Sequence, residues 1–399
     1  MWRACDRAAS ALAVAVVLAF DTGAAPARAP PADDARWADV TRFGAKGDGV
    51  ADDTDAFRRA AATGKDLRVP RPTAHYRLTG KVVVHGSVVG EGMPEIRMYG
   101  ADGGRDNAHV MFELNRYDGP GAVFRGLHLD GQWDGRSTVG EWSHLIQIRA
   151  SRNVTVEDNV LERPYGDCVL IGGEGYPAPS ENVVVRNNRM TAPRRCAVAV
   201  ISARRLLVRG NTISKSTDYV AAIDLEPNPD IPEPTPDYQL VEDVEISGNR
   251  FDVPGGNAIM LHSPPGNRLA NRRVTISGNT ATARRFLLKM AKTGTWNAVS
   301  VTENRFLGDA APYGSGDVSF VRIDHDPQTA PRSIRQLVVE RNVIDGAVRP
   351  GQTYRDYIRG VDGLRLVGNR WMGAKSYRLS VVDSPGAQLA SNEPARLPP

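Results

Sequence analysis

The chain of 399 residues is long enough for one large domain or two ordinary ones. Charged residues make up 24% of it, which is ordinary for a soluble globular protein, and its 39 glycines and 27 prolines follow no strict period that would indicate collagen. The formal net charge of +4 is compatible with an acidic polymer as a partner. The sequence has no dense basic stripe or aromatic-interleaved motif, so we expect no nucleic-acid partner.

Residues 1–29 are typical of a secretory signal peptide. Arg3 and Arg7 precede an apolar stretch, residues 8–20, that is too short to span a bilayer comfortably. Small residues at 25–29 offer cleavage sites, and an uncleaved membrane anchor is the alternative. We therefore expect a secreted protein, extracellular or periplasmic, with no stable membrane insertion once the signal is removed.

Residues 30–63 are predicted to form an N-terminal cap segment. The stretch 40–62, VTRFGAKGDGVADDTDAFRRAAA, indicates a glycine-rich turn and then a helix that is capped near Asp52 to Thr54. Such a helix can cover the open end of a solenoid, whose strand edges would otherwise be exposed. The aspartates of this stretch are therefore predicted to cap the helix rather than to catalyse a reaction.

Residues 64–399 repeat a short alternating apolar strand that ends in an asparagine, as in NVTVEDNVL at 153–161 and DVEISGNRF at 243–251. The asparagines are spaced by 23 to 38 residues, which indicates solenoid coils with loops inserted at a corner. Asparagine suits a tight bend because it tolerates a left-handed backbone, and stacked asparagines can bond one another in a ladder. They are Asn159, Asn188, Asn211, Asn249, Asn279, Asn304, Asn342 and Asn369.

A second short strand follows each asparagine, so a coil holds two or three strands and no helix. Such coils bury their apolar positions only by stacking on the next coil. Leucine-rich repeats and β-propellers are the rival architectures, but the leucine pattern and the Trp-Asp signature are absent. The sequence therefore predicts an all-β fold, a single-stranded parallel β-helix over residues 64–399 with a short N-terminal capping helix.

Residues 40–78 resemble the N-terminal signature of the pectate-lyase-like superfamily, which includes rhamnogalacturonase-like, epimerase-like and phage tailspike proteins. The resemblance implies a right-handed β-helix, usually extracellular and often acting on polysaccharides, without fixing the reaction. Of the polygalacturonase pattern only Gly166-Asp167-Cys168 is similar to the Gly-Asp-Asp-Cys element, with one aspartate missing. The residues that carry the resemblance are Phe43, Gly44, Ala45, Gly47, Asp48, Gly49, Asp52, Asp53, Thr54, Val69, Pro70 and Tyr76.

Charged side chains gather on the outer face of the second strands when these are aligned by their inward apolar pairs. The pairs used are Ile223/Leu225, Ile259/Leu261, Leu288/Met290 and Val321/Ile323. Because neighbouring strands lie about 4.8 Å apart, the outward residues form one patch over four consecutive coils. We predict that this patch is catalytic, and it consists of Asp224, Glu226, His262, Lys289, Arg322 and Asp324.

The chemistry of this patch has several possible forms. Asp224 and Glu226 could act as acid with base or nucleophile in glycoside hydrolysis, could bind Ca²⁺, or could hold Lys289 and Arg322 in an ion-pair ladder. In β-elimination, a lysine, arginine or histidine removes the proton α to a uronate carboxylate, and Lys289, Arg322 and His262 are candidates. Some β-helix lyases place acidic Ca²⁺ ligands beside a Lys/Arg pair, and this arrangement is similar, so the expected cofactor is either none or Ca²⁺.

Loops supply the predicted walls of the site, with Trp133 and Trp142 in one insertion, Tyr313 in another, and Arg149 as a further substrate-binding residue. Cys168 and Cys196 are predicted to be stacked interior residues rather than a redox pair. We expect a secreted carbohydrate-active enzyme that cleaves an acidic polysaccharide by β-elimination or hydrolysis, with the Lys/Arg pair favouring β-elimination. The alternative is a non-catalytic carbohydrate-binding or surface-adhesion β-helix.

Overall fold

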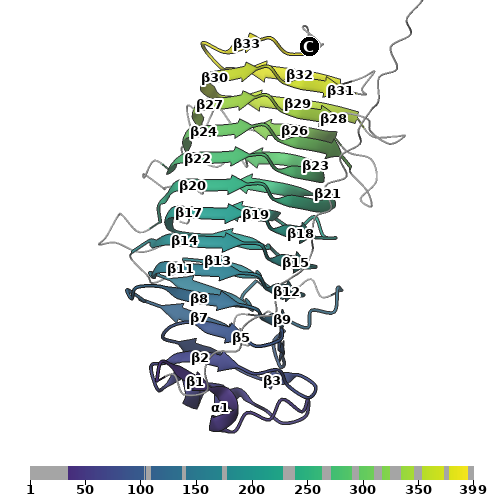
Figure 1. Ribbon diagram of the computed structural model, residues 1–399. Coiled ribbons are helices and arrows are strands. Elements are labelled where there is room, and N and C mark those ends of the chain that lie inside the picture. Colours follow the sequence, from purple (N-terminus) through teal and green to yellow (C-terminus); the bar gives the residue numbers. More distant parts are fainter. Residues whose placement is uncertain are drawn as a thin grey trace, which may run out of the picture.

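The computed structural model shows a tall stack of coils that rises from a 3-10 helix, η1 (Val40–Phe43), and an α-helix at the N-terminal end (Figure 1). Residues 1–29, the predicted signal peptide, lie outside the described part of the chain. No helix within the described part is long and apolar enough to cross a membrane. The structure describes residues 35–102, 104, 109–136, 141–172, 178–227, 239–262, 271–289, 296–309, 317–323, 334–345, 353–372 and 377–393.

Sheet 1 runs the length of the stack and contains thirteen parallel strands, one from each coil. Its central residues stack on one another from coil to coil, as Val185 does on Val156 and Val208. The strands are β1 (Trp37–Asp39), β2 (Asp66–Val69), β5 (Val88–Gly90), β8 (Ala122–Arg125), β11 (Arg152–Glu157), β14 (Ser180–Arg186), β17 (Ala203–Arg209), β20 (Val241–Ser247), β22 (Asn271–Ser277), β24 (Trp296–Thr302), β27 (Ile334–Glu340), β30 (Val361–Val367) and β33 (Gln388–Ala390).

The second sheet has two arms, which join where β21 (Arg250–Leu261) and β23 (Thr280–Lys289) run through both. The first arm contains β3 (Tyr76–Leu78), β6 (Glu95–Met98), β9 (His128–Asp130), β12 (Val160–Glu162), β15 (Arg189–Thr191), β18 (Thr212–Ser214), β25 (Arg305–Gly308), β28 (Val343–Asp345) and β31 (Arg370–Met372). The second arm contains β4 (Val82–Val84), β7 (Phe112–Asn115), β10 (Ile146–Arg149), β13 (Val169–Ile171), β16 (Val198–Val200), β19 (Ala221–Leu225), β26 (Asp317–Ile323), β29 (Thr353–Arg359) and β32 (Tyr377–Val382).

One complete coil therefore takes a strand from sheet 1, one from the first arm and one from the second arm, as β11, β12 and β13 do. All pairings between coils are parallel, and the apolar side chains of the three faces meet in one continuous core. A coil buries its inward residues only because another coil lies above and below it. The parallel β-helix predicted from the repeat is confirmed.

The asparagine ladder forms as predicted, at the corner between sheet 1 and the first arm. The side chain of Asn249 donates to Asn279 Oδ1 at 3.0 Å and to Val208 O at 2.9 Å, while its own Oδ1 accepts from the side chain of Asn211 at 3.0 Å. Asn392 extends the ladder by one more coil. The left-handed residue is not the asparagine, however, but the one before it, such as Gly248 at φ 61°. The asparagine is needed for its amide rather than for its backbone.

The short helix α1 (Thr54–Ala61) lies across the N-terminal end of the coils, as predicted (Figure 1). Its Phe57 is fully buried and packs edge-on against Tyr76, with ring centroids 5.3 Å apart. Asp52 accepts the N–H of Thr54 at 3.0 Å, which satisfies one of the free donors of the first turn. Asp53 is buried and accepts the backbone N–H of Lys46 at 2.6 Å. Both aspartates are therefore structural, in agreement with the prediction.

The predicted alignment of one strand is wrong by one residue. In β23 the inward pair is Leu287 and Lys289, which align with Val321 and Ile323 of the next coil. Lys289 therefore points into the helix, where it is 0% exposed, and Leu288 takes the outward position. A slip of one residue moves every side chain of a strand to the other face. Phe286, Leu287 and Leu288 are all apolar, although consecutive residues of a strand point to opposite faces. The pattern alone therefore does not show which of them point inward and does not fix the register.

A buried carboxyl group in the C-terminal coils makes the stability of the protein depend on pH. Asp356 accepts the N–H groups of Phe320 and Val321 at 2.7 and 2.9 Å, the hydroxyl of Tyr354 at 2.9 Å and Nε1 of Trp371 at 3.2 Å. Burial nevertheless raises the pKa of Asp356 to about 6, because it penalises the charged form.

We expect Asp356 to keep its proton in the folded state at pH values at which it has already lost this proton in the unfolded chain. Asp356 then contributes about 3 kcal/mol of stability at acidic pH, and this contribution disappears as the pH rises through about 6. Urea unfolding of the wild type and of Asp356→Asn gives the free energy of unfolding of each protein at about pH 4 and about pH 7, and we expect it to fall between these pH values more in the wild type than in the variant. The same pH dependence in both proteins would show that Asp356 does not titrate in this range.

Candidate active site

Asp224 and Glu226 lie at the end of β19 and point to the outer face of the second arm. Asp224 aligns with Ala199 of the coil before and with Met260 of the coil after, which are both outward residues. Its side chain is 0% exposed, whereas that of Glu226 is 16% exposed. Glu226 is therefore the member of the pair that reaches the surface. The outward direction predicted for both acids is confirmed.

Two basic side chains hold Glu226 in place. Nδ1 of His262, in the residue that follows β21, lies 2.7 Å from Glu226 Oε1. Arg195, which precedes β16, donates from Nη2 to Glu226 Oε2 at 2.6 Å. Both oxygens of the carboxylate are thus engaged by neighbours from adjacent coils. These contacts fix the orientation of Glu226 before any ligand binds.

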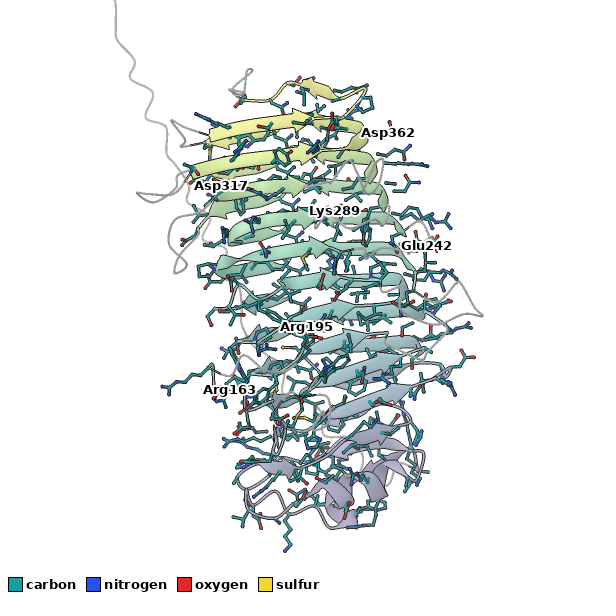
Figure 2. All side chains as sticks on the ribbon, turned by 180° about the vertical axis from the view of Figure 1, so that it is seen from behind. Arg163, Arg195, Glu242, Lys289, Asp317 and Asp362 are labelled. Carbon is teal, nitrogen blue, oxygen red and sulfur yellow. The ribbon has the colours of Figure 1, made fainter. Side chains whose placement is uncertain are left out.

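A third acid, Asp167, completes the cluster on the N-terminal side. Its Oδ1 accepts the backbone N–H of Cys196 at 3.0 Å and lies 3.9 Å from Nε of Arg195. Its Oδ2 lies 3.1 Å from Nδ1 of His144. Arg195 therefore lies between Asp167 and Glu226, near the middle of the stack (Figure 2).

The environments of the two neighbouring acids shift their pKa values in opposite directions. Burial, and then the negative charge of Glu226, raise the pKa of Asp224 well above its usual range. Burial also opposes the ionisation of Glu226, but His262 and Arg195 outweigh it and hold the pKa of Glu226 below its usual value. Among the described residues no donor group satisfies either oxygen of Asp224. Burial and the charge of Glu226 therefore favour a proton on Asp224, so a proton taken up by the pair is held by Asp224 in preference to Glu226.

Asp167 stays ionised despite its complete burial. Desolvation disfavours its charged form, but Arg195 and His144 together hold the pKa of Asp167 below its usual range. The cluster thus combines an acid whose pKa is raised, Asp224, with two carboxylates whose pKa values are lowered and with the guanidinium of Arg195. Groups whose environments push their pKa values apart are typical of acid–base sites.

The patterns in the sequence did not predict Asp167, Arg195 and His144 as members of this cluster. The signal for Asp167 was present, since Gly166-Asp167 is the part of the polygalacturonase element that the chain retains. A β-carbon on Gly166 would lie 2.6 Å from Nδ1 of His144, so the glycine lets this histidine approach. Arg195 and His144 lie outside the regular strands and carry no periodic signal.

The predicted patch of four coils is not continuous. Lys289 lies inside the helix, and burial lowers its pKa to about 8 (Figure 2). Arg322 does point outward, but Met260 and Leu288 separate it from Asp224 in the outward column. Asp324 lies outside the described residues. The structure therefore brings together Asp224, Glu226 and His262 and leaves Lys289 and Arg322 apart from them.

The predicted sugar-binding residues occupy different places. Trp133 is 5% exposed, so its ring does not offer a face to a ligand, and this part of the prediction is wrong. Trp142 is half-buried and follows Glu141, whose carboxylate accepts a hydrogen bond from the Tyr219 hydroxyl. Arg149 lies three strands before Glu226, at the end of β10. Tyr313 falls outside the described residues.

The pair of acids does not fit the predicted Ca²⁺ site. Calcium prefers six to eight oxygen ligands, most of them charged or carbonyl oxygens. Both oxygens of Glu226 are engaged by Arg195 and His262, and burial disfavours the charged form of Asp224 that a cation would need. Within the described residues, no group of three or more His, Cys, Asp or Glu side chains could hold a metal ion.

The two cysteines are free thiols on adjacent coils. Cys168 packs in the main core, and Cys196 packs with Leu170 and Ala199 on the outer face. Both are buried, and burial raises the pKa of each thiol well above its usual value. Neither is therefore a reactive group of the site.

A groove of about 610 Å³ lies elsewhere, along the C-terminal part of sheet 1. It crosses β22, β24, β27, β30 and β33, where Ala298 and Gly363 leave space between longer side chains. Its lining includes Arg273 and Arg365 but no carboxylate. It therefore offers no acid–base pair, and we place the candidate site at Asp224 and Glu226.

Comparison with known proteins supports the fold. A family model described as the right-handed β-helix region matches residues 125–320. PfbA, a surface adhesin of Streptococcus pneumoniae, is similar with a TM-score of 0.63 and 16% identity, over 89% of this chain and 90% of that one. No curated protein matches the chain significantly.

Two further solved structures share the fold. The tailspike protein of E. coli bacteriophage HK620 has a TM-score of 0.62 and 15% identity, over 90% of this chain and 66% of that one. A hyperthermoactive exopolygalacturonase from Thermotoga maritima has a TM-score of 0.52 and 13% identity, over 80% of this chain and 90% of that one. The chain is thus a right-handed parallel β-helix, as the resemblance to the pectate-lyase-like superfamily implied.

Proposed function

We propose that this β-helix is a secreted enzyme that hydrolyses glycosidic bonds of a polysaccharide at the Asp224–Glu226 pair. The observation that carries the proposal is the pairing of a fully buried acid, Asp224, with the more exposed carboxylate of Glu226 that Arg195 and His262 hold, an arrangement that raises the pKa of Asp224 and lowers that of Glu226. Glycosidases need such a division, because one carboxyl group protonates the leaving oxygen while a carboxylate acts on the sugar ring. The pair supplies both roles from one strand.

In this proposal the proton held by the pair passes to the glycosidic oxygen as its bond to the sugar ring breaks, and a water molecule adds to the ring and returns a proton to the pair. Asp224 is fully buried, so the proton reaches a substrate through Glu226, which is the exposed member, or after the side chains that cover Asp224 move apart. The negative charge of the pair stabilises the positive charge that develops on the sugar ring. Arg195 and His262 orient Glu226 for this role and stabilise its negative charge.

The relatives in fold support a carbohydrate as the ligand. The HK620 tailspike was solved in complex with a pentasaccharide, and the enzyme from Thermotoga maritima is an exopolygalacturonase. A sugar polymer outside the cell also agrees with the signal peptide predicted for residues 1–29.

β-Elimination is the second candidate, and a specific contact favours it. The 2.7 Å contact between His262 Nδ1 and Glu226 Oε1 orients the imidazole as a carboxylate orients a catalytic histidine. His262 would then remove the proton α to a uronate carboxylate. The Lys/Arg pair that favoured this reaction in the sequence no longer supports it, because Lys289 is buried inside the helix.

Incubation of the protein with a panel of acidic and neutral polysaccharides separates these possibilities. We expect new reducing ends without the ultraviolet absorbance of an unsaturated product, which indicates hydrolysis. A parallel rise in both signals would replace hydrolysis by β-elimination, with His262 as the base. Binding of a polysaccharide without any product would make the protein a binding module, like the adhesin that shares its fold.

A further inference from the structure

The groove on the C-terminal part of sheet 1 follows a column of bends in the strands. In each coil from β11 to β33, one residue near the start of the sheet 1 strand has a left-handed backbone, with φ between 54° and 72°. The pairings of the flanking residues place these bends one above another. We call them the bend column, and they are Asn153, Asn182, Arg205, Asp243, Arg273, Ala298, Gln336, Gly363 and Gly386.

The first part of the bend column is filled by side chains that bond one another. Nδ2 of Asn182 donates to Asn153 Oδ1 at 2.9 Å, and Nε of Arg205 donates to Asn182 Oδ1 at 2.6 Å. Nη2 of Arg273 donates to Asp243 Oδ2 at 3.0 Å. Cross-strand contacts of this kind stabilise a sheet, and they leave no open space along these coils.

Beyond Arg273 most residues of the bend column are small, and the groove of about 610 Å³ opens there. No described atom lies within 4 Å of a β-carbon placed on Gly386. For a β-carbon placed on Gly363, the nearest described atom is Cα of Gln336, at 3.8 Å. The groove thus exists because Ala298, Gly363 and Gly386 stand where the earlier coils carry long side chains.

Backbone preference does not explain the small residue at Ala298. Its φ is 55°, in the left-handed region that alanine rarely adopts. Asparagine tolerates this region better, and Asn153 and Asn182 hold the same conformation at φ 57° and 54°. Ala298 therefore has an unfavourable backbone conformation for its type, and it leaves the groove open.

The charges around the groove are balanced. Arg273 contacts both Glu242 and Asp243, and Arg365 contacts Glu340. The other polar side chains of the lining are hydroxyls and amides, which donate and accept hydrogen bonds without charge. They are Thr275, Ser300, Gln336 and Gln388. A ligand that fits this lining is neutral and rich in hydroxyl groups.

The spacing of the strands also fits a chain of sugars. The strands β22, β24, β27, β30 and β33 cross the groove one after another at the C-terminal end of sheet 1 (Figure 1). Neighbouring strands lie about 4.8 Å apart, close to the length of one sugar ring in an extended chain, so the groove spans roughly four rings. The backbones of these strands are paired with each other, so an extended peptide could not add to them as a further strand here.

We propose that this groove is a second, non-catalytic binding site, which takes a neutral stretch of the polysaccharide. The choice of a polysaccharide rests on the proposed function, whereas the open groove and its balanced charges do not. A polymer bound on sheet 1 stays attached to the protein while another part of it reaches Glu226 on the second arm. Such attachment raises the local concentration of substrate at the acids.

The test fills the groove with the residue type that the chain itself uses in the bend column. The filled variant is Ala298→Asn/Gly363→Asn. Its matched control, Gly248→Asn/Gly278→Asn, changes two left-handed positions beside the asparagine ladder, where an added β-carbon also meets no described atom within 4 Å. A third variant, Ser300→Ala/Gln388→Ala, removes a hydroxyl and an amide of the lining without adding volume.

Binding is measured with dextran, amylose and galactomannan as neutral polymers, and with polygalacturonate and denatured casein for comparison. We expect the filled variant to bind a neutral polymer about tenfold to a hundredfold more weakly than the wild type. The third variant should also bind it more weakly, and the control should bind it as the wild type does. The rate of cleavage of fragments too short to reach both sites should be the same in all four proteins.

Equal binding of the neutral polymers by the filled variant and the control would overturn the proposal, as would a wild type that binds none of them. A loss confined to casein would make the ligand a peptide and overturn it as well. Groove-dependent binding of a neutral polymer without any product would retain the groove site and reject the hydrolysis. Cleavage of a polymer whose binding is unaffected by the filling would retain the hydrolysis and reject the groove site.

Discussion

Replacing Glu226 by glutamine is expected to lower the rate of polysaccharide cleavage by about a thousandfold, while the affinity for the polymer stays within a few-fold. The amide keeps the shape of the side chain but removes the charge that Arg195 and His262 hold in place. It also removes the carboxylate that shares a proton with Asp224. Initial rates of reducing-end formation and a direct binding measurement on the same polymer separate the two effects.

Glu340→Gln is the matched control for this variant. Glu340 lies on sheet 1, where it is similarly buried and contacts Arg341 and Arg365. Its replacement removes a glutamate with two arginine partners, but far from the acids of the second arm. We expect the control to cleave at the wild-type rate. A Glu226→Gln variant that cleaves equally well would remove the pair from the mechanism.

The asparagine ladder is expected to carry a large part of the stability of the stack, and Asn249→Ala should lower the free energy of unfolding by about 4 kcal/mol. The change deletes the donor to Val208 O and to Asn279 Oδ1, and the acceptor of two N–H groups of Asn211. All these groups are buried, so water does not replace the lost partners without further opening of the coil. The denaturant midpoint and its slope measure the loss.

Asn297→Ala provides the comparison for the ladder variant. Asn297 is partly exposed on the outer face of β24, and it aligns with arginines of the neighbouring coils. A surface substitution of this kind usually changes the stability by less than about 0.5 kcal/mol. Equal effects of the two variants would mean that the stacked amides contribute no more than an exposed asparagine.

The repeat and its asparagines determined the architecture from the sequence alone. Each coil must stack on the next to bury its apolar residues, so a recurring strand that ends in an asparagine is evidence for the whole solenoid. The same reasoning placed α1 at the open end and Asp224 and Glu226 on the outer face of β19. These features depend on neighbouring residues along the chain and on the alternation of side chains along a strand. Both can be read directly from the sequence.

The tertiary structure alone decided which side chains meet across coils. Arg195 and His144 come from bends, where no periodicity predicts direction, and they reach the acids only because adjacent coils stack closely. Lys289 was misplaced because its strand is apolar on both faces, and only its pairing with β26 sets the register. The raised pKa of Asp224 was likewise beyond the sequence, since it follows from complete burial beside the charge of Glu226. Strand alternation is a local property, whereas register, burial and ionisation arise from contacts between residues that are distant along the chain.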